Sequence, residues 1–327
     1  MKEQPWAARP RWTDRIELVL SCAGAAVALF MFLVWLPRHA TRPDVREVDL
    51  YIYYQTALRL AHGEPIYTGF FVYPPMFAAL IRPAAAVSLP VFQAGWYVVM
   101  VVAFWAYAAG LARVAFGALT LRRVLAVAPL IALTPGTDAI MSFGNIDFII
   151  WALIAWALPD RGGLAVAGCL KFYPAIVAAA GIVRRPATAW RQLAAAATVV
   201  ALSLLVLGPG PFVEWVRAGG VPLPNCTLIP PNVSLSTGVL RILHVTAFRG
   251  GLARIVYLIV PALVIGATLW GTRRWSPLAG AAAVLIATVW SAPVCWIGWL
   301  PILYIPLAVW VRSRLSVRAH SGYDAIT

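Results

Sequence analysis

The chain has 327 residues, of which 62% are hydrophobic and only 12% are charged. A soluble domain carries about 25% charged residues, so this composition excludes an ordinary water-soluble globule. The 26 Lys and Arg residues outnumber the 12 Asp and Glu residues, which gives a net charge of +14. These basic residues stand between long apolar runs, a placement that favours loops beside anionic membrane lipid over a nucleic-acid partner.

The apolar runs predict an all-α, polytopic membrane protein with about ten transmembrane helices. A helix that crosses a membrane needs roughly 20 apolar residues, and the runs that supply them are 18–36, 73–82 with 83–112, 124–140, 146–159, 163–183, 193–207, 255–272 and 275–311. The stretches 73–112 and 275–311 are each long enough for two helices, separated near 88–90 and 291–293. We read the first run as a retained anchor and the whole of 1–327 as one membrane domain.

The basic residues predict the orientation of the chain. Lys and Arg concentrate in short cytoplasmic loops, and the basic clusters in 2–15, 184–191, 273–274 and 312–318 fall on one side of a ten-span topology. We therefore expect a multi-pass protein of the cell membrane with both termini in the cytoplasm. Three arginines between 113 and 123 fall on the other side, so a re-entrant or additional helix near 113–145 would change this topology.

Two polar segments, 37–73 and 209–254, are too long to be simple connectors, and both fall on the outer side. Long structured loops in compact proteins are often functional. Each segment contains a stretch with the pattern of a helix, 49–62 in the first and 234–244 in the second.

The first outer loop carries the residues most suited to chemistry. Asp49 and Tyr53 are four residues apart and share one face of the expected helix. An acid can take the proton of an acceptor hydroxyl during glycosyl transfer, and aromatic rings offer flat apolar faces to sugars. The alternative is that Asp49 only stabilises the start of a helix, and the local pattern leaves both interpretations open.

Lys171 lies within an apolar span, where a cation is costly and is usually functional or paired. It could offer a counter-charge to a phosphate, it could extend its ammonium group to the membrane surface, or it could form a structural pair with Asp147 or Asp138. Asn145 could cap a helix or join two helices by hydrogen bonds. The four cysteines have no paired spacing, and no motif indicates a protein-held metal or a nucleotide-binding loop, so we expect neither metal nor cofactor.

Several motifs follow one another in a characteristic order. They are Asp49, Tyr53-Tyr54, Gly63, Pro65, Tyr67 and Tyr73-Pro74-Pro75, then Gly144-Asn145-Ile146-Asp147, Lys171-Phe172-Tyr173-Pro174 and Pro231-Asn232-Val233-Ser234-Leu235. This order resembles glycosyltransferase family 87, the polyprenol-phosphate-mannose-dependent α-mannosyltransferases with a multi-span GT-C fold. The resemblance extends over roughly residues 48–300.

The resemblance implies a membrane glycosyltransferase that moves a sugar, with mannose the first expectation, from a polyprenyl-phosphate donor to a lipid or glycan acceptor on the outer face. Its partners would be membrane lipid, this donor and this acceptor. Asp49 would be the catalytic base. The expected substrate-binding residues are Tyr53, Tyr54, Tyr67, Tyr73, Asn145, Lys171, Tyr173 and Asn232.

One motif departs from the family pattern. Relatives often carry Ser-Pro-x-Ser-Trp-x-His-His near the last spans, whereas this chain reads Ala292-Pro293-Val294-Cys295-Trp296-Ile297-Gly298-Trp299. The loss of both histidines keeps a catalytically inactive relative open as an alternative. A transporter or lipid flippase is the other alternative, although no pair of matching halves is visible.

Overall fold

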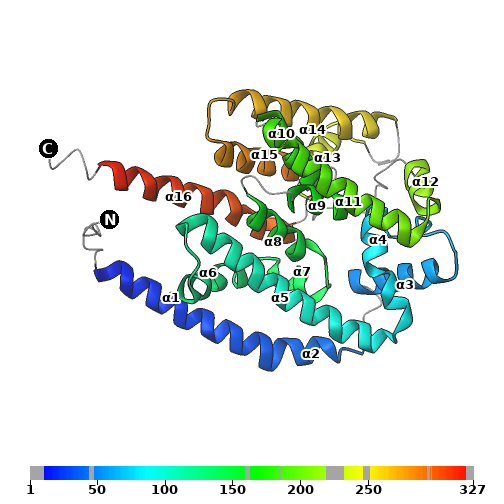
Figure 1. The fold of residues 1–327 in the computed structure, drawn as a ribbon, viewed down its shortest axis with the longest axis horizontal. Helices are drawn as coiled ribbons and strands as arrows, with labels where there is room; N and C mark the ends of the chain where they lie inside the picture. The colour runs from blue at the N-terminus through cyan, green and yellow to red at the C-terminus, as the bar shows by residue number, and fades with distance from the viewer. Residues whose placement is uncertain are drawn as a thin grey trace.

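The computed structural model describes residues 11–43, 48–158, 163–184, 186–218, 232–245, 251–292, 295 and 297–321. The regular elements in these ranges are helices, which confirms the all-α expectation (Figure 1). The α-helices are α1 (Arg11–Phe30), α2 (Leu36–Ala40), α3 (Asp49–Ala61), α4 (Pro75–Ile81), α5 (Leu89–Phe116), α6 (Leu121–Ala132), α7 (Thr137–Ser142), α8 (Asp147–Ala157), α9 (Gly163–Leu170), α10 (Tyr173–Arg184), α11 (Ala189–Leu207), α12 (Gly210–Arg217), α13 (Leu235–Ile242), α14 (Gly251–Gly271), α15 (Pro277–Ser291) and α16 (Tyr304–Ser321).

Among the described residues, four helical segments are long and apolar enough to cross a membrane: Asp14–Ala40, Leu89–Phe116, Ala189–Leu207 and Gly251–Gly271. α5 is largely buried, while the other three expose most of their apolar surface, as a lipid-facing helix does. Three shorter apolar helices, Asp147–Ala157, Tyr173–Val183 and Pro277–Ser291, accompany them. These features describe a multi-pass membrane protein, and the number of about ten spans stays a prediction.

The first span is one continuous helical rod whose turns widen before a proline. Residues Met31–Trp35 form a π-helical stretch between α1 and α2, and the backbone N–H of Leu36 donates to Met31 O. Pro37 has no N–H, and its ring would clash with the carbonyl four residues earlier in a regular α-helix. The wider turn accommodates this proline, so the rod reaches Ala40 without a break.

The expected single span over 163–183 is wrong: it is two helices, α9 and α10, that meet at Lys171 and Phe172. Pro174 explains the break, because a proline at the second position of α10 cannot continue α9. The run 124–140 is divided in the same way into α6 and α7, which are separated at 133–136 around Pro135. The breaks expected near 88–90 and 291–293 are present, since α5 begins at Leu89 and α15 ends at Ser291.

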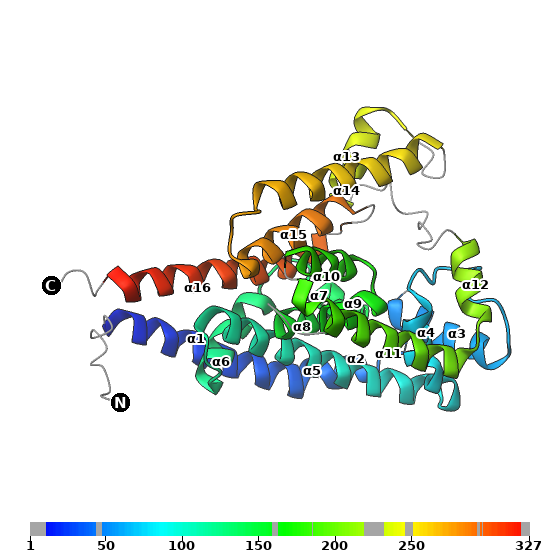
Figure 2. The same ribbon diagram turned by 45° about the horizontal axis from the view of Figure 1, so that its top comes forward.

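α5 lies in the middle of the bundle and packs against α2, α6, α8 and α16. In Figures 1 and 2, α1 follows one edge of the molecule and α14 the opposite edge, with α5, α8 and α10 between them. α3, α4 and α12 gather at the end opposite to the start of α1 and the end of α16. The two helices expected within the long polar segments are thus present as α3 and α13.

A side chain of α12 joins the second polar segment to the first. The Glu214 carboxylate accepts hydrogen bonds from the backbone N–H groups of Ile66, at 3.2 Å, and Tyr67, at 2.7 Å. These bonds fix the chain between α3 and α4 against α12 and hold Tyr67 in place. The segment that leads to Tyr73 is therefore anchored from outside the bundle.

Candidate active site

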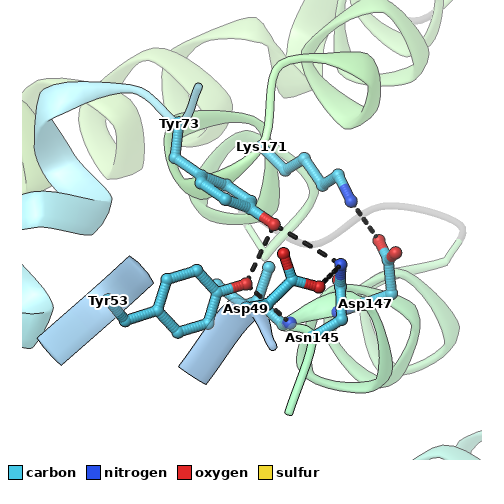
Figure 3. A network of polar contacts seen from close by, with 7 residues as sticks. Asp49, Tyr53, Tyr73, Asn145, Asp147 and Lys171 are labelled. Carbon is cyan, nitrogen blue, oxygen red and sulfur yellow. Dashed lines mark hydrogen bonds and ion pairs between the residues drawn. The ribbon is translucent and has the colours of Figure 1, made fainter. Parts of the chain in front are cut away.

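Four helices begin around one small volume, and each brings a polar side chain to it (Figure 3). Asp49 is the first residue of α3, and Asp147 is the first residue of α8. Tyr73 precedes α4 by two residues, and Lys171 precedes α10 by two residues. The start of a helix carries partial positive charge and free N–H groups, so this volume suits carboxylates and other anions.

Asp49 is engaged by a neighbouring helix start and does not cap its own helix. The N-cap of α3 is Val48, which makes no side-chain capping bond. The Asp49 Oδ2 atom instead accepts a hydrogen bond of 2.8 Å from Asn145 Nδ2. Asn145 also accepts, through Oδ1, the backbone N–H of Asp147 at 3.0 Å. One amide thus stabilises the start of α8 and orients the carboxylate of α3.

Two tyrosine hydroxyls complete the surroundings of Asp49. Tyr53 Oη donates to Tyr73 Oη at 2.9 Å and accepts the backbone N–H of Ile146 at 3.3 Å. Asn145 Nδ2 reaches Tyr73 Oη at 3.5 Å. The Tyr53 ring packs edge-on against Phe77, at 4.8 Å between ring centroids. The expected pairing of Asp49 and Tyr53 on one helix face therefore places both in the same polar cluster.

Burial sets the protonation of this cluster. It raises the pKa of Asp49 above the ordinary 3.8, and the Asn145 hydrogen bond and the Lys171 charge oppose that rise. Burial also raises the pKa of Tyr53 and of Tyr73 well above 10.0, so both hydroxyls keep their protons. The tyrosines therefore act as neutral hydrogen-bonding groups, and only the carboxylates of the cluster are suited to accept a proton.

Lys171 forms an ion pair with Asp147, with 2.6 Å between Nζ and Oδ1. The Asp147 side chain is completely buried, whereas 15% of the Lys171 side chain is exposed. The ammonium also lies 4.6 Å from the ring centroid of Trp299 and 5.7 Å from that of Tyr73. The pairing with Asp147 that the sequence left open is thus present, and it lies beside Asp49.

Asp147 is the site member that sequence reasoning considered only as a structural partner. Its second oxygen, Oδ2, is buried and has no hydrogen-bond partner among the described residues. Two signals could have placed it in the site: it follows Asn145 by two residues, and it opens an apolar helix in a chain with a lysine in another apolar run. Charged side chains of opposite sign that are buried among apolar helices usually form an ion pair.

The remaining expected substrate residues lie at different distances from Asp49. Tyr67 donates through its hydroxyl to the backbone oxygen of Tyr73 at 3.0 Å, so it helps to fix the position of Tyr73. Tyr173 is buried and its ring lies 5.8 Å from that of Trp299. Both residues border the cluster, and their contact with a substrate stays a prediction.

Tyr54 and Asn232 make their contacts outside the cluster. Tyr54 donates to the backbone oxygen of Val87 at 3.0 Å and stacks on Phe92. Asn232 is completely buried, and its Oδ1 accepts the backbone N–H of Cys295 at 2.9 Å. These contacts give Tyr54 and Asn232 structural roles, and their expected binding of substrate remains untested.

The segment that lacks the family's histidine pair is closely packed. Gly136 has a φ of +88°, and a Cβ atom built on it would lie 2.3 Å from the Cα of Gly298. Gly298 in turn faces Ile140, whose Cγ1 would lie 3.3 Å from an added Cβ. The neighbouring Trp299 is buried and covers Lys171. An aromatic face therefore stands beside the ammonium in this chain.

We predict that Lys171→Met lowers the thermal stability of the purified protein strongly, because Asp147 would keep a buried charge without its partner. Breaking one side of a buried pair costs on the order of 3–5 kcal/mol. The double variant Lys171→Met/Asp147→Asn removes both charges and should recover most of the loss. Thermal unfolding of the two single variants, the double variant and the wild type tests this, and equal stability of the Lys171→Met and double variants would contradict the pairing.

Comparison with known proteins agrees with the helical membrane architecture. The model of glycosyltransferase family 87 matches residues 71–312, more than half of the chain. No curated protein and no solved structure matches the chain. The matched range includes Tyr73, Asn145, Asp147 and Lys171 but begins after Asp49, so the role of Asp49 as base stays a prediction. The chain belongs to glycosyltransferase family 87 and is a membrane glycosyltransferase.

Proposed function

We propose that this enzyme takes a sugar, with mannose the expected one, from a polyprenyl-phosphate donor. The acceptor is a hydroxyl group of a lipid or glycan at the outer face of the cell membrane, and both termini lie in the cytoplasm. The observation that supports the proposal best is the Asp49 carboxylate held beside Lys171, whose side chain is partly exposed, at four helix starts. In this proposal the donor phosphate is the leaving group, and no metal or cofactor takes part.

Asp49 acts as the general base. Its Oδ2 is held by Asn145, and the raised pKa of the carboxyl makes its ionised form a better proton acceptor than an ordinary aspartate. The acceptor oxygen attacks the anomeric carbon while the carbon–oxygen bond to phosphate breaks. The hydroxyl proton passes to Asp49, the bonding electrons leave with the phosphate, and the anomeric configuration inverts. A phosphate needs little protonation to leave, so a single base is sufficient.

Lys171 supplies a counter-charge for the donor phosphate. An ammonium group has three N–H donors, and the short bond to Asp147 Oδ1 uses one of them. In this proposal the other two bind phosphate oxygens, and the partial exposure of the Lys171 side chain supports that. The N-termini of α8 and α10 add partial positive charge on the same side. Asp147 keeps the lysine in position and makes the pair neutral before the donor arrives.

Aromatic side chains offer the sugar a platform between base and cation. Tyr73 lies near both, since its hydroxyl is 3.5 Å from the Asn145 Nδ2 that holds Asp49 and its ring centroid is 5.7 Å from Lys171 Nζ. Trp299 borders the other side of Lys171. Flat apolar faces suit sugar rings, so a pyranose between Tyr73 and Trp299 would have its anomeric carbon near Lys171 and Asp49.

We predict that Asp49→Asn reduces transfer from polyprenyl-phosphate-mannose by about 10²–10⁴-fold, the usual contribution of a general base. Folding favours the protonated form of a carboxyl whose pKa is raised, and the stability gained is lost as pH rises through that pKa. A neutral amide should therefore leave the melting temperature at pH 7 unchanged or higher. The matched control is Asp14→Asn, an exposed acid at the far end of α1. Transfer at the wild-type rate in Asp49→Asn would remove this residue from catalysis.

We predict that the kcat/KM of transfer rises with pH along an acid limb whose midpoint lies above 3.8, because Asp49 must be ionised to act as the base. Asn145 lowers the pKa of Asp49 through its hydrogen bond. Asn145→Ala should therefore move the limb to higher pH, whereas a purely structural change would lower the rate at every pH alike. A limb that stays in place in Asn145→Ala would contradict the role given to this hydrogen bond.

We predict that Lys171→Met/Asp147→Asn folds but raises the KM for the donor by at least about tenfold. Hydrogen bonds to charged groups contribute about 1.5–3 kcal/mol, and 1.4 kcal/mol corresponds to a factor of ten in affinity. The matched variant Asp147→Asn keeps the cation and should bind the donor better than the double variant. Donor titration at fixed acceptor concentration provides the measurement, and equal donor affinity in these two variants would argue against Lys171 as the phosphate partner.

A further inference from the structure

A polar cavity lies outside the catalytic cluster, at the end of the first span. Its volume is about 540 Å³, and it is lined by Arg38, His39, Thr41, Arg42, Pro43 and Ser142. Ligand sites commonly have volumes of about 300–1,000 Å³, so this cavity is large enough to hold a small polar group. None of the residues that line it belongs to the proposed catalytic machinery.

The chemistry of the lining is that of an anion site. Two arginines and a histidine line the cavity, and among the residues that the structure describes no acidic side chain lines it. The planar guanidinium fork binds phosphate through paired hydrogen bonds, and Thr41 and Ser142 add hydroxyl groups. The exposed Asp138, which is not a lining residue, accepts from Ser142 Oγ through Oδ1 at 3.2 Å. Asp138 thus orients the serine from outside the cavity.

The cavity walls are held by hydrogen bonds from side chains of α5. Gln93 is buried in α5, and its Nε2 donates to the backbone oxygens of His39, at 2.6 Å, and Arg42, at 3.0 Å. On the opposite wall, Tyr97 donates to the backbone oxygen of Ser142 at 2.6 Å. Both walls are thus hydrogen-bonded to α5, which holds in place the end of α2 with Arg38 and the turn with Arg42.

The depth of the cavity indicates the source of the anion. Arg38 and Arg42 flank Ala40, the last residue of the first candidate span, Asp14–Ala40. The end of a span lies at the level of the lipid headgroups. Phe32 and Leu33, one to two turns earlier in the same span, are 54% and 71% exposed. Exposed apolar side chains on the same span offer contacts for acyl chains, while the basic cavity at its end offers contacts for a headgroup phosphate.

We propose that this cavity binds the phosphate of an anionic membrane lipid headgroup, held by Arg38 and Arg42. The segment 142–145 separates it from the catalytic cluster, because Ser142 lines the cavity while Asn145 contacts Asp49. A bound lipid would therefore press on the same short segment that orients the proposed base.

The test is a titration of short-chain phosphatidylglycerol into the full-length protein in a neutral detergent, without sugar donor. Arg38→Gln/Arg42→Gln should raise the Kd at least about tenfold, as expected for the loss of charge-assisted hydrogen bonds. The matched control Arg312→Gln/Arg314→Gln removes the same charge from exposed positions of α16 and should keep the wild-type Kd. Phosphatidylcholine should bind at least about tenfold more weakly than phosphatidylglycerol to the wild type.

Four outcomes would overturn the proposal. An equal loss of affinity in both double variants would show attraction by net charge alone, and an unchanged Kd in Arg38→Gln/Arg42→Gln would place the lipid elsewhere. Competition by inorganic phosphate at the concentration of the lipid would assign the cavity to a soluble phosphate. A cavity variant that loses polyprenyl phosphate but retains phosphatidylglycerol would make it part of the donor site. The binding assay involves no sugar transfer, so a failure of the proposed transfer reaction would leave its result unaffected.

Discussion

Each helix that begins inside an apolar bundle leaves backbone N–H groups that need partners. In this enzyme the starts of α3, α4, α8 and α10 meet at one place. Two side chains of the candidate site satisfy N–H groups at the start of α8, since Tyr53 accepts that of Ile146 and Asn145 that of Asp147. Asn145 illustrates the coupling, since one side chain accepts the N–H of Asp147 and donates to Asp49. The same hydrogen bonds thus stabilise the start of a helix and hold the side chains of the candidate site in place.

The Asp147–Lys171 pair extends this principle from dipoles to full charges. A lone ion at this depth would be expensive, and a close pair reduces that cost only when its geometry is good. Here the two partners differ in exposure, because the Asp147 side chain is completely buried and the Lys171 side chain is partly exposed. That asymmetry leaves the cation available to a ligand while its position stays fixed. It also places one positive and one negative charge near Asp49, with opposite effects on its pKa.

Local pattern was enough to predict much of the fold. The tyrosine-rich helix α3, the helix α13 and the breaks before α5 and after α15 follow from periodicity, glycine and proline within a few residues. Pro174 carried the same kind of signal for the break between α9 and α10, but the long apolar composition of 163–183 concealed it. Lys171 therefore lies at a helix junction and not in the middle of a span.

The same local patterns could not predict which residues that are distant in the sequence lie together in the site. Asp49 and Asn145 are 96 residues apart, and Lys171 is 24 residues from Asp147, so no local periodicity relates them. Tyr54 resembles Tyr53 in sequence, yet one residue further along a helix turns a side chain by about 100°, and Tyr54 packs on Phe92 instead of Tyr73. Residue type identified the candidates, and only packing decided which of them meet.

The π-helical stretch Met31–Trp35 determines which way the end of the first span faces. A wider turn holds more residues, so everything after it is rotated relative to a regular α-helix, in which successive residues are about 100° apart. The angular phase of Arg38 and His39 is therefore set by a defect that Pro37 imposes one turn earlier. If the first span were a regular α-helix throughout, the Arg38 side chain would point in a different direction around the helix axis. Pro37 thus influences the direction in which its bonded neighbour Arg38 leaves the first span, towards the cavity that Ser142 also lines.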